Sequence, residues 1–151
     1  MTQQIVIADA SCLITLDNIN ENDLLPKLFD QIYVTPEVAD EVGDSLPEWA
    51  SQRSSSNQSL VNQLSAELEI GEATSIALAL ELSECLLIID EKKGRRIAKQ
   101  LGLNITGTFG IIMKGFEAGL VDAPDTIVER LERVGFRISE TLKEKMRAKI
   151  Q

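Results

Sequence analysis

The sequence predicts a three-layer α/β/α fold, in which helices cover both faces of a central, mostly parallel sheet of four to five short strands. Short apolar runs of strand length alternate along the chain with segments of helical periodicity. The runs Ile5–Ala8 and Leu86–Ile89 are apolar throughout, as is typical of strands buried on both faces. With 151 residues the chain can bury one good core, so we expect a single domain over residues 1–151.

The first half of the chain predicts two strands, at residues 4–9 and 31–34, separated by helices at 11–18 and 22–29. Thr35 and Pro36 then supply an N-cap and a proline at the first helical position, which predicts a helix over 36–42. Gly43 ends this helix. A further short helix is predicted at 46–49, and the polar run at 53–57 predicts a surface loop.

In the second half, a helix over 72–83 has Ala73, Ile76, Ala77 and Leu80 along one face. The other predicted elements are a helix at 60–68, a strand at 85–90, a helix at 91–101, a strand at 104–106, a helix at 108–118, and two polar helices at 124–134 and 139–150.

Four carboxylates recur where this fold could bring them together. Asp9 and Asp90 each end an apolar strand, while Glu41 and Glu72 lie on helices that follow turn signals. Because the carboxyl ends of parallel strands form the edge where open α/β sheets usually bind ligands, we expect these acids to meet there. Carboxylates gathered in one place repel one another unless a cation neutralises them. Divalent metal chemistry on phosphate is therefore the first interpretation.

Each acid also has a structural alternative. An Asp after a strand often serves as a helix N-cap, which applies to both Asp9 and Asp90. Glu72 lies in a first helical turn, where the helix dipole favours an anion. Glu41 differs, since it lies near the end of its helix, where the dipole disfavours a carboxylate. A bound metal would explain that placement.

A basic segment follows Asp90 directly. On a helix, Lys92, Arg95 and Arg96 form one stripe together with Lys99, opposite apolar side chains. The stripe is either a solvated helix face or a contact for the phosphate backbone beside the metal site. We expect RNA contacts at Lys92, Arg95 and Arg96.

The composition excludes several classes of function. The chain has no histidine, which excludes His-dependent nucleophilic sites, His-ligated zinc and imidazole acid–base catalysis. The net charge of −9 argues against a general electrostatic nucleic-acid binder. Cys12 and Cys85 have neither disulfide nor metal-type spacing. Without a signal peptide or a membrane-spanning run, we expect a cytoplasmic protein that does not associate with membranes.

The order and spacing of these motifs resemble a PIN domain over nearly the whole chain, and in particular a prokaryotic branch of short PIN-like proteins. The motifs that carry the resemblance are Ile7–Ser11, Val34–Pro36 with Glu41 downstream, Gly71–Ala73, Leu87–Asp90 before the basic helix, Gly107–Ile111 and Gly135–Ser139.

The resemblance implies an endoribonuclease that depends on Mg²⁺ or Mn²⁺. Many relatives are toxins of toxin–antitoxin pairs, inhibited by a small antitoxin protein. Carried over position by position, the metal-binding and catalytic acids are Asp9, Glu41, Glu72 and Asp90, and Glu72 stands where many relatives carry Asp. Ser11 is the hydroxyl near the first acid, and Thr108 stands near the fourth.

We therefore expect a metal-dependent phosphodiesterase acting on RNA, in the form of a homodimer. One alternative is a catalytically weak or inactive PIN-like module used for protein association. A second is a Mg²⁺-dependent phosphatase of another α/β family. Asp9-Ala10-Ser11 lacks the second acid two residues on that an aspartyl-phosphate loop of the haloacid-dehalogenase type needs.

Overall fold

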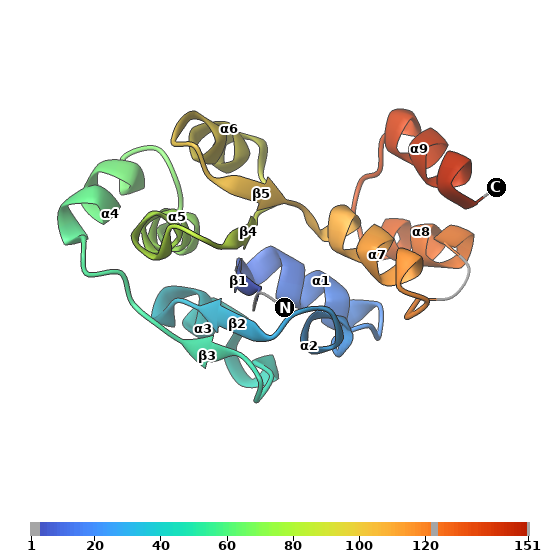
Figure 1. Ribbon diagram of the computed structural model, residues 1–151, viewed down its shortest axis with the longest axis horizontal. Coiled ribbons are helices and arrows are strands. Elements are labelled where there is room, and N and C mark those ends of the chain that lie inside the picture. Colours follow the sequence, from blue (N-terminus) through green and yellow to red (C-terminus); the bar gives the residue numbers. More distant parts are fainter. Residues whose placement is uncertain (1–3, 122–123, 151) are drawn as a thin grey trace.

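The computed structural model describes residues 4–121 and 124–150, and the remaining positions of the predicted domain lie outside the described residues. Its centre is a parallel sheet with the strand order β3-β2-β1-β4-β5 (Figure 1). The strands are β1 (Ile5–Ala8), β2 (Gln31–Val34), β3 (Ser51–Gln52), β4 (Leu86–Ile88) and β5 (Asn104–Thr106). This arrangement confirms the predicted fold class.

The central strand β1 is buried on both faces. Val6 and Ala8 point into one hydrophobic core, and Ile7 points into a second core on the other side of the sheet. In the register of the sheet, Ile7 lies between Tyr33 of β2 and Leu87 of β4. The continuous apolar run of this strand is therefore required by two cores rather than one.

Helices cover both faces of the sheet (Figure 1). The face of Ile7 packs against α4 (Gln58–Ser65), α5 (Ile70–Leu82) and α6 (Lys92–Gln100). The core of Val6 and Ala8 is completed by side chains of α1 (Ala10–Asn18), α2 (Leu24–Leu28), α3 (Pro36–Val42), α7 (Thr108–Glu117), α8 (Pro124–Arg133) and α9 (Glu140–Ile150).

Local signals in the sequence fix the start and end of α3. The Thr35 hydroxyl accepts a hydrogen bond from the Val38 amide at 3.2 Å, and Pro36 occupies the first turn. Gly43 ends the helix with a φ of 71°, in the left-handed region that favours glycine. These signals place Glu41 in the last turn of α3.

The structure corrects one predicted helix and adds one strand. Residues 46–49 are not helical, because Leu46 precedes a proline and adopts an extended backbone; a 3₁₀ turn over Gly43–Ser45 precedes them. The strand β3 follows at Ser51–Gln52 and pairs with Tyr33 and Val34. Both residues of β3 are polar and exposed, so no alternation of apolar and polar side chains indicates this strand. The other elements lie where predicted, with small shifts at their ends.

Within residues 4–121 and 124–150, the chain contains no helix with the length and apolar character that crossing a membrane would require.

Candidate functional site

Asp9 follows β1 at the carboxyl edge of the sheet. It occupies the N-cap position of α1, but its side chain makes no capping hydrogen bond. Although only 8% of Asp9 is exposed, its carboxylate faces other acids across a pocket. The pKa of Asp9 is raised to about 6, mainly by burial; a hydrogen bond from the Ala10 amide opposes this rise, and the neighbouring charges of Glu41, Asp90 and Glu69 add to it. The capping alternative therefore does not account for the Asp9 side chain.

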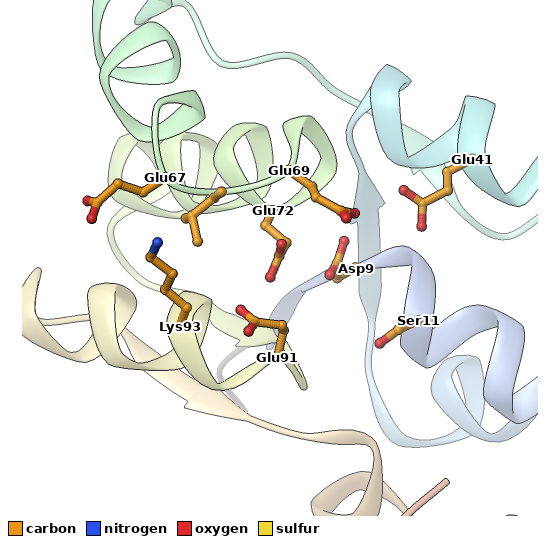
Figure 2. A pocket seen from close by; sticks show the side chains of 9 residues that line it. Asp9, Ser11, Glu41, Glu67, Glu69, Glu72, Glu91 and Lys93 are labelled. Carbon is orange, nitrogen blue, oxygen red and sulfur yellow. The ribbon is translucent and has the colours of Figure 1, made fainter. Parts of the chain in front are cut away.

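Glu41 and Asp9 approach the same glycine from different elements. A Cβ atom at Gly71, in the first turn of α5, would lie 3.5 Å from Asp9 Oδ1 and 3.6 Å from Glu41 Oε1. The absence of a side chain at Gly71 leaves the space between these carboxylates open. Glu41 thus points from the end of α3 toward the pocket, as Figure 2 shows.

Glu72 is buried to the same extent as Asp9, with 8% of its surface exposed. It lies in the first turn of α5, and its Oε2 atom is buried without a hydrogen-bond partner. This oxygen packs against Gly94 of α6, where a Cβ atom would come within 2.8 Å of it. Burial, followed by the charges of Asp9 and Glu91, raises the pKa of Glu72 to about 7. A buried carboxylate oxygen without a donor is what an arriving cation would satisfy.

Asp90 is held in place by hydrogen bonds from Ser11 and Thr108. Its carboxylate accepts hydrogen bonds from the Thr108 amide at 2.7 Å, from the Thr108 hydroxyl at 2.5 Å and from the Ser11 hydroxyl at 2.9 Å. The N-cap of α6 is the next residue, Glu91, which accepts from the Gly94 amide at 2.9 Å. Asp90 is therefore not the cap of the helix that follows it. Ser11, expected near the first acid, bonds to the fourth.

The pocket between these elements has a volume of about 380 Å³ and is strongly acidic (Figure 2). It brings together three of the predicted acids, Asp9, Glu41 and Glu72, with Ser11 at its edge. Asp90 is not part of the lining and connects to the pocket through Ser11. The other lining residues are Glu67, Leu68, Glu69, Glu91 and Lys93.

Sequence reasoning did not identify Glu67, Glu69, Glu91 or Lys93 as site residues. Glu91 carried a signal, since it stands three residues before a glycine at a helix start, which is a capping arrangement. Glu67 and Glu69 lie between α4 and α5, and no motif marks them. Lys93 is the one cation among the lining residues of this pocket.

The donor set fits a divalent cation such as Mg²⁺ or Mn²⁺. These ions prefer carboxylate and water oxygens, and the pocket holds six acidic residues against one lysine. In the described parts of the chain, however, no three acidic or cysteine side chains stand close enough to hold an ion in their present positions. Binding would therefore have to draw Asp9, Glu41 and Glu72 closer together.

The three residues predicted to contact RNA do not lie together. Lys92 and Arg95 line a second groove together with Asp90, and Arg95 Nη1 donates to the Ile89 carbonyl at 2.7 Å. Arg96 is exposed and lines neither this groove nor the acidic pocket. The basic stripe is thus not one continuous surface around the acids.

The chain is similar to known proteins at the level of a family model and of a solved structure. A family model described as a PIN domain matches residues 5–151. No curated protein matches the chain. Among solved structures, it is similar to a PilT N-terminus domain protein from the hyperthermophilic archaeon Sulfolobus solfataricus P2. The likeness has 18% identity and a TM-score of 0.47, and covers 76% of this chain and 95% of the other.

Proposed function

Because this chain belongs to the PIN domain family, which is typically a nuclease fold, we propose that it is a metal-dependent endoribonuclease that hydrolyses RNA phosphodiester bonds. The observation that carries the proposal is the acidic pocket at the carboxyl edge of the sheet. There Asp9, Glu41 and Glu72 converge from three different elements, although their mutual repulsion and burial raise the pKa values of Asp9 and Glu72. A bound divalent cation would offset both the repulsion between the carboxylates and the cost of burying their charge.

Asp9, Glu41 and Glu72 would hold Mg²⁺ or Mn²⁺ through carboxylate oxygens. When bound, such an ion supplies a water of lowered pKa as nucleophile and neutralises the charge that develops on the phosphate. Asp90 would take part from the neighbouring wall, where Thr108 and Ser11 fix the direction of its carboxylate. Lys92 and Arg95, next to Asp90, would hold the phosphate backbone with little base specificity.

Glu72 in the first turn of α5 and Glu91 at the N-cap of α6 both line the pocket (Figure 2). The hydrogen bond from the Gly94 amide lowers the pKa of Glu91, so this carboxylate stays charged while the buried Glu72 tends to hold a proton. Glu72 would release that proton when a cation binds. Metal binding should accordingly release protons to solvent near neutral pH.

A second candidate function is a PIN-like module that associates with another protein without cleaving RNA. The separation of the acidic side chains in the described residues favours it, since no preformed three-carboxylate group is present there. Under this alternative, the protein would bind Mn²⁺ weakly and would not turn over RNA.

The decisive experiment measures cleavage of labelled RNA by purified protein over a range of Mg²⁺ and Mn²⁺ concentrations. We expect Asp9→Asn to abolish cleavage. The matched control is Asp40→Asn, because Asp40 is exposed on α3 and does not line the pocket. Equal rates for wild type and Asp9→Asn would contradict the nuclease assignment and point to a contaminating activity.

We further propose that the protein acts as the toxin of a toxin–antitoxin pair, as its resemblance to such proteins suggests. Expression of the wild type should then arrest growth, while Asp9→Asn should not. Co-expression of a small protein encoded beside it should restore growth. If both the wild type and Asp9→Asn arrest growth, the toxicity does not depend on the acidic pocket.

A further inference from the structure

A second groove of about 590 Å³ lies beside the acidic pocket: Asp90 and Lys92 line the groove, while the next residue after each, Glu91 and Lys93, lines the pocket. Its walls come from the start of α6, from the connection between β5 and α7, and from the segment that joins α8 to α9. The side chains that matter for its chemistry are Lys92 and Arg95 of α6, Phe109 of α7, and Phe136 and Arg137 of the joining segment.

The groove concentrates positive charge in a chain whose net charge is −9. Lys92, Arg95 and Arg137 line it, and none of the three forms an ion pair with an acidic side chain of residues 4–121 or 124–150. Asp90, the one acid in the lining, already accepts hydrogen bonds from Ser11 and Thr108. The three cations are therefore available to an anionic ligand.

The groove also contains two of the four phenylalanines of the chain. Phe109 is buried and forms part of the wall, whereas Phe136 is only half-buried. Phe136 and Arg137 also line an adjoining hollow of about 510 Å³, so they separate two depressions. A partly exposed ring beside an arginine can support a nucleic-acid base by stacking.

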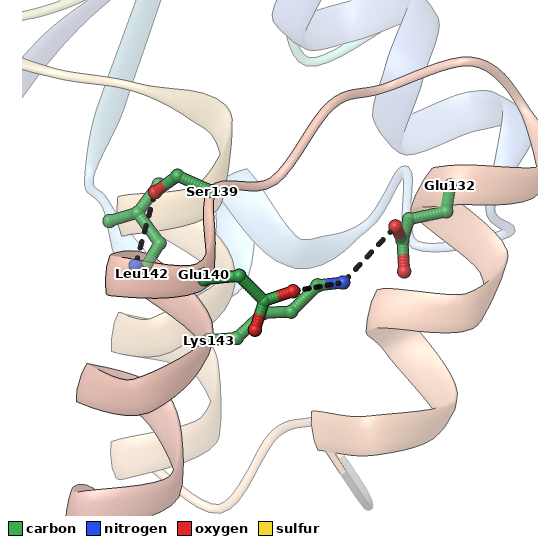
Figure 3. Close-up of polar contacts among 5 residues, drawn as sticks. All are labelled: Glu132, Ser139, Glu140, Leu142 and Lys143. Atoms are coloured by element: carbon green, nitrogen blue, oxygen red, sulfur yellow. Dashed lines mark hydrogen bonds and ion pairs between the residues drawn. The ribbon is translucent and has the colours of Figure 1, made fainter.

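Contacts on either side anchor the segment that carries Phe136 and Arg137. The next residue, Ile138, is buried with 8% exposure and anchors the segment to the core. Lys143 of α9 forms ion pairs with Glu132 of α8 at 3.3 Å and with Glu140 at 3.6 Å (Figure 3). The segment thus runs between two helices that are tied to each other at its ends.

Arg95 is fixed in the same groove from the other side. Its Nη1 atom donates to the Ile89 carbonyl at 2.7 Å, which leaves the remaining guanidinium donors for a ligand. The absence of a side chain at Gly107 permits this position, since a Cβ there would lie 3.1 Å from Arg95 Nη1 and 2.9 Å from Asp90 Oδ1. Arg95 is therefore held in place before any ligand binds.

We propose that this groove binds the unpaired nucleotides of RNA that flank the phosphate at the acidic pocket. Lys92, Arg95 and Arg137 contact phosphates, and a base stacks on Phe136. The inference rests on the proposed ribonuclease function and adds to it a subsite, at Phe136 and Arg137, for the nucleotides that flank the phosphate. A duplex keeps its bases stacked inside, so only an unpaired base can reach the ring.

The test measures binding rather than cleavage, with Ca²⁺ present to suppress turnover and with labelled single-stranded RNA at several salt concentrations. We expect Arg137→Gln to reduce the slope of log affinity against log salt by ~0.7, because one phosphate contact is lost. Arg133→Gln is the matched control, since Arg133 is exposed on α8 and does not line the groove. Its slope should equal that of the wild type.

The base contact is tested with Phe136→Leu and with an RNA that carries an abasic site. Phe136→Leu should weaken binding of intact RNA by about tenfold, from the loss of one stacked base. The weakening should disappear for the RNA whose abasic position faces the ring. Because Phe136 also packs on the core, thermal melting checks its fold. Lys92→Gln, at an exposed position, tests the groove independently through the salt slope.

Two outcomes overturn the proposal. Wild-type affinity and slope in both Arg137→Gln and Lys92→Gln would remove the groove from RNA binding. Competition by polyglutamate as strong as by RNA, with no effect of abasic sites, would instead identify a surface for an acidic protein. Cleavage in Mn²⁺, measured in parallel, separates this result from a failure of the nuclease proposal. If the wild type cleaves no RNA but binds it, and the groove variants bind it more weakly, the groove proposal holds and the nuclease proposal fails.

Discussion

The Ser11 hydroxyl donates a hydrogen bond to the Asp90 carboxylate at 2.9 Å, which joins the start of α1 to the end of β4 across 79 positions of the sequence. Ser11 lines the acidic pocket, while Asp90 lines the neighbouring groove. This single bond is therefore the polar link between the two hollows. Both residues follow the carboxyl ends of adjacent parallel strands, so the pairing of β1 with β4 brings them together.

The first prediction concerns the hydroxyls that hold Asp90. Thr108→Val should lower the free energy of unfolding by about 1.5–3 kcal/mol, because it removes a buried hydrogen bond to a charged group. Ser11→Ala should cost less, since Ser11 is exposed. Urea unfolding measures both. If Ser11→Ala proved the more destabilising of the two, Thr108 would not be the main support of Asp90.

The second prediction concerns Asp9 and metal. Asp9→Asn removes one charge from a crowded acidic pocket at nearly constant shape, so stability in EDTA should hold or rise slightly. Added Mn²⁺ should raise the melting temperature of the wild type and of Asp40→Asn but not of Asp9→Asn. An equal response of all three proteins to Mn²⁺ would place the ion elsewhere.

The third prediction is a pH dependence of stability without metal. The folded pKa values of Asp9 and Glu72, about 6 and about 7, lie above the ordinary values of 3.8 and 4.5. The folded state therefore binds more protons than the unfolded chain, and stability increases as the pH falls through the folded pKa values. We expect a higher melting temperature at about pH 5.5 than at about pH 8 in EDTA.

Two controls accompany this pH profile. The Asp9→Asn/Glu72→Gln double variant should show a flatter profile between these pH values, because both titrating carboxyls are gone. Glu81 and Glu91 have lowered pKa values, so their contributions are lost only at more acidic pH, below the ordinary value of 4.5. A profile as steep in the double variant as in the wild type would show that other groups cause it.

The fourth prediction concerns Gly94. Replacing a helical glycine with alanine usually stabilises a helix by roughly 0.5–1 kcal/mol. Here the new Cβ would lie 2.7 Å from Ile89 Cδ1 and 2.8 Å from Glu72 Oε2. We expect Gly94→Ala to destabilise the protein by about 1–3 kcal/mol and to weaken Mn²⁺ binding, since Glu72 must shift. Chemical unfolding and metal titration check it, and Arg96→Ala, exposed on the same helix, should leave both unchanged.

The position of the candidate site could be predicted from the sequence because its signals are local. An apolar run that ends in Asp specifies a buried strand and places the acid at the sheet edge, which holds for both Asp9 and Asp90. Thr35, Pro36 and Gly43 set the bounds of α3 and thereby the place of Glu41. These are properties of a few adjacent residues, so no knowledge of the rest of the fold is needed.

The direction of each side chain could not be predicted in the same way. Asp90 points toward Ser11 and Thr108 rather than into the pocket of Asp9, because α7 begins beside it and offers an amide and a hydroxyl. The start of α7 lies 18 positions further along the chain, and its approach depends on the pairing of β4 with β5. No local sequence pattern predicts that the start of α7 lies beside Asp90.

By itself, the sequence determined the fold class, most of the element bounds and the family of this protein, because strand, cap and turn preferences act over a few residues. Only the tertiary structure decided which side chains share a hollow. It brought Glu69 and Glu91 to the acidic pocket, and it placed Phe136 and Arg137 beside Asp90 although they follow by more than 40 positions. The physical reason is that such neighbours are selected by the packing of whole helices on two cores, which depends on residues from the entire chain.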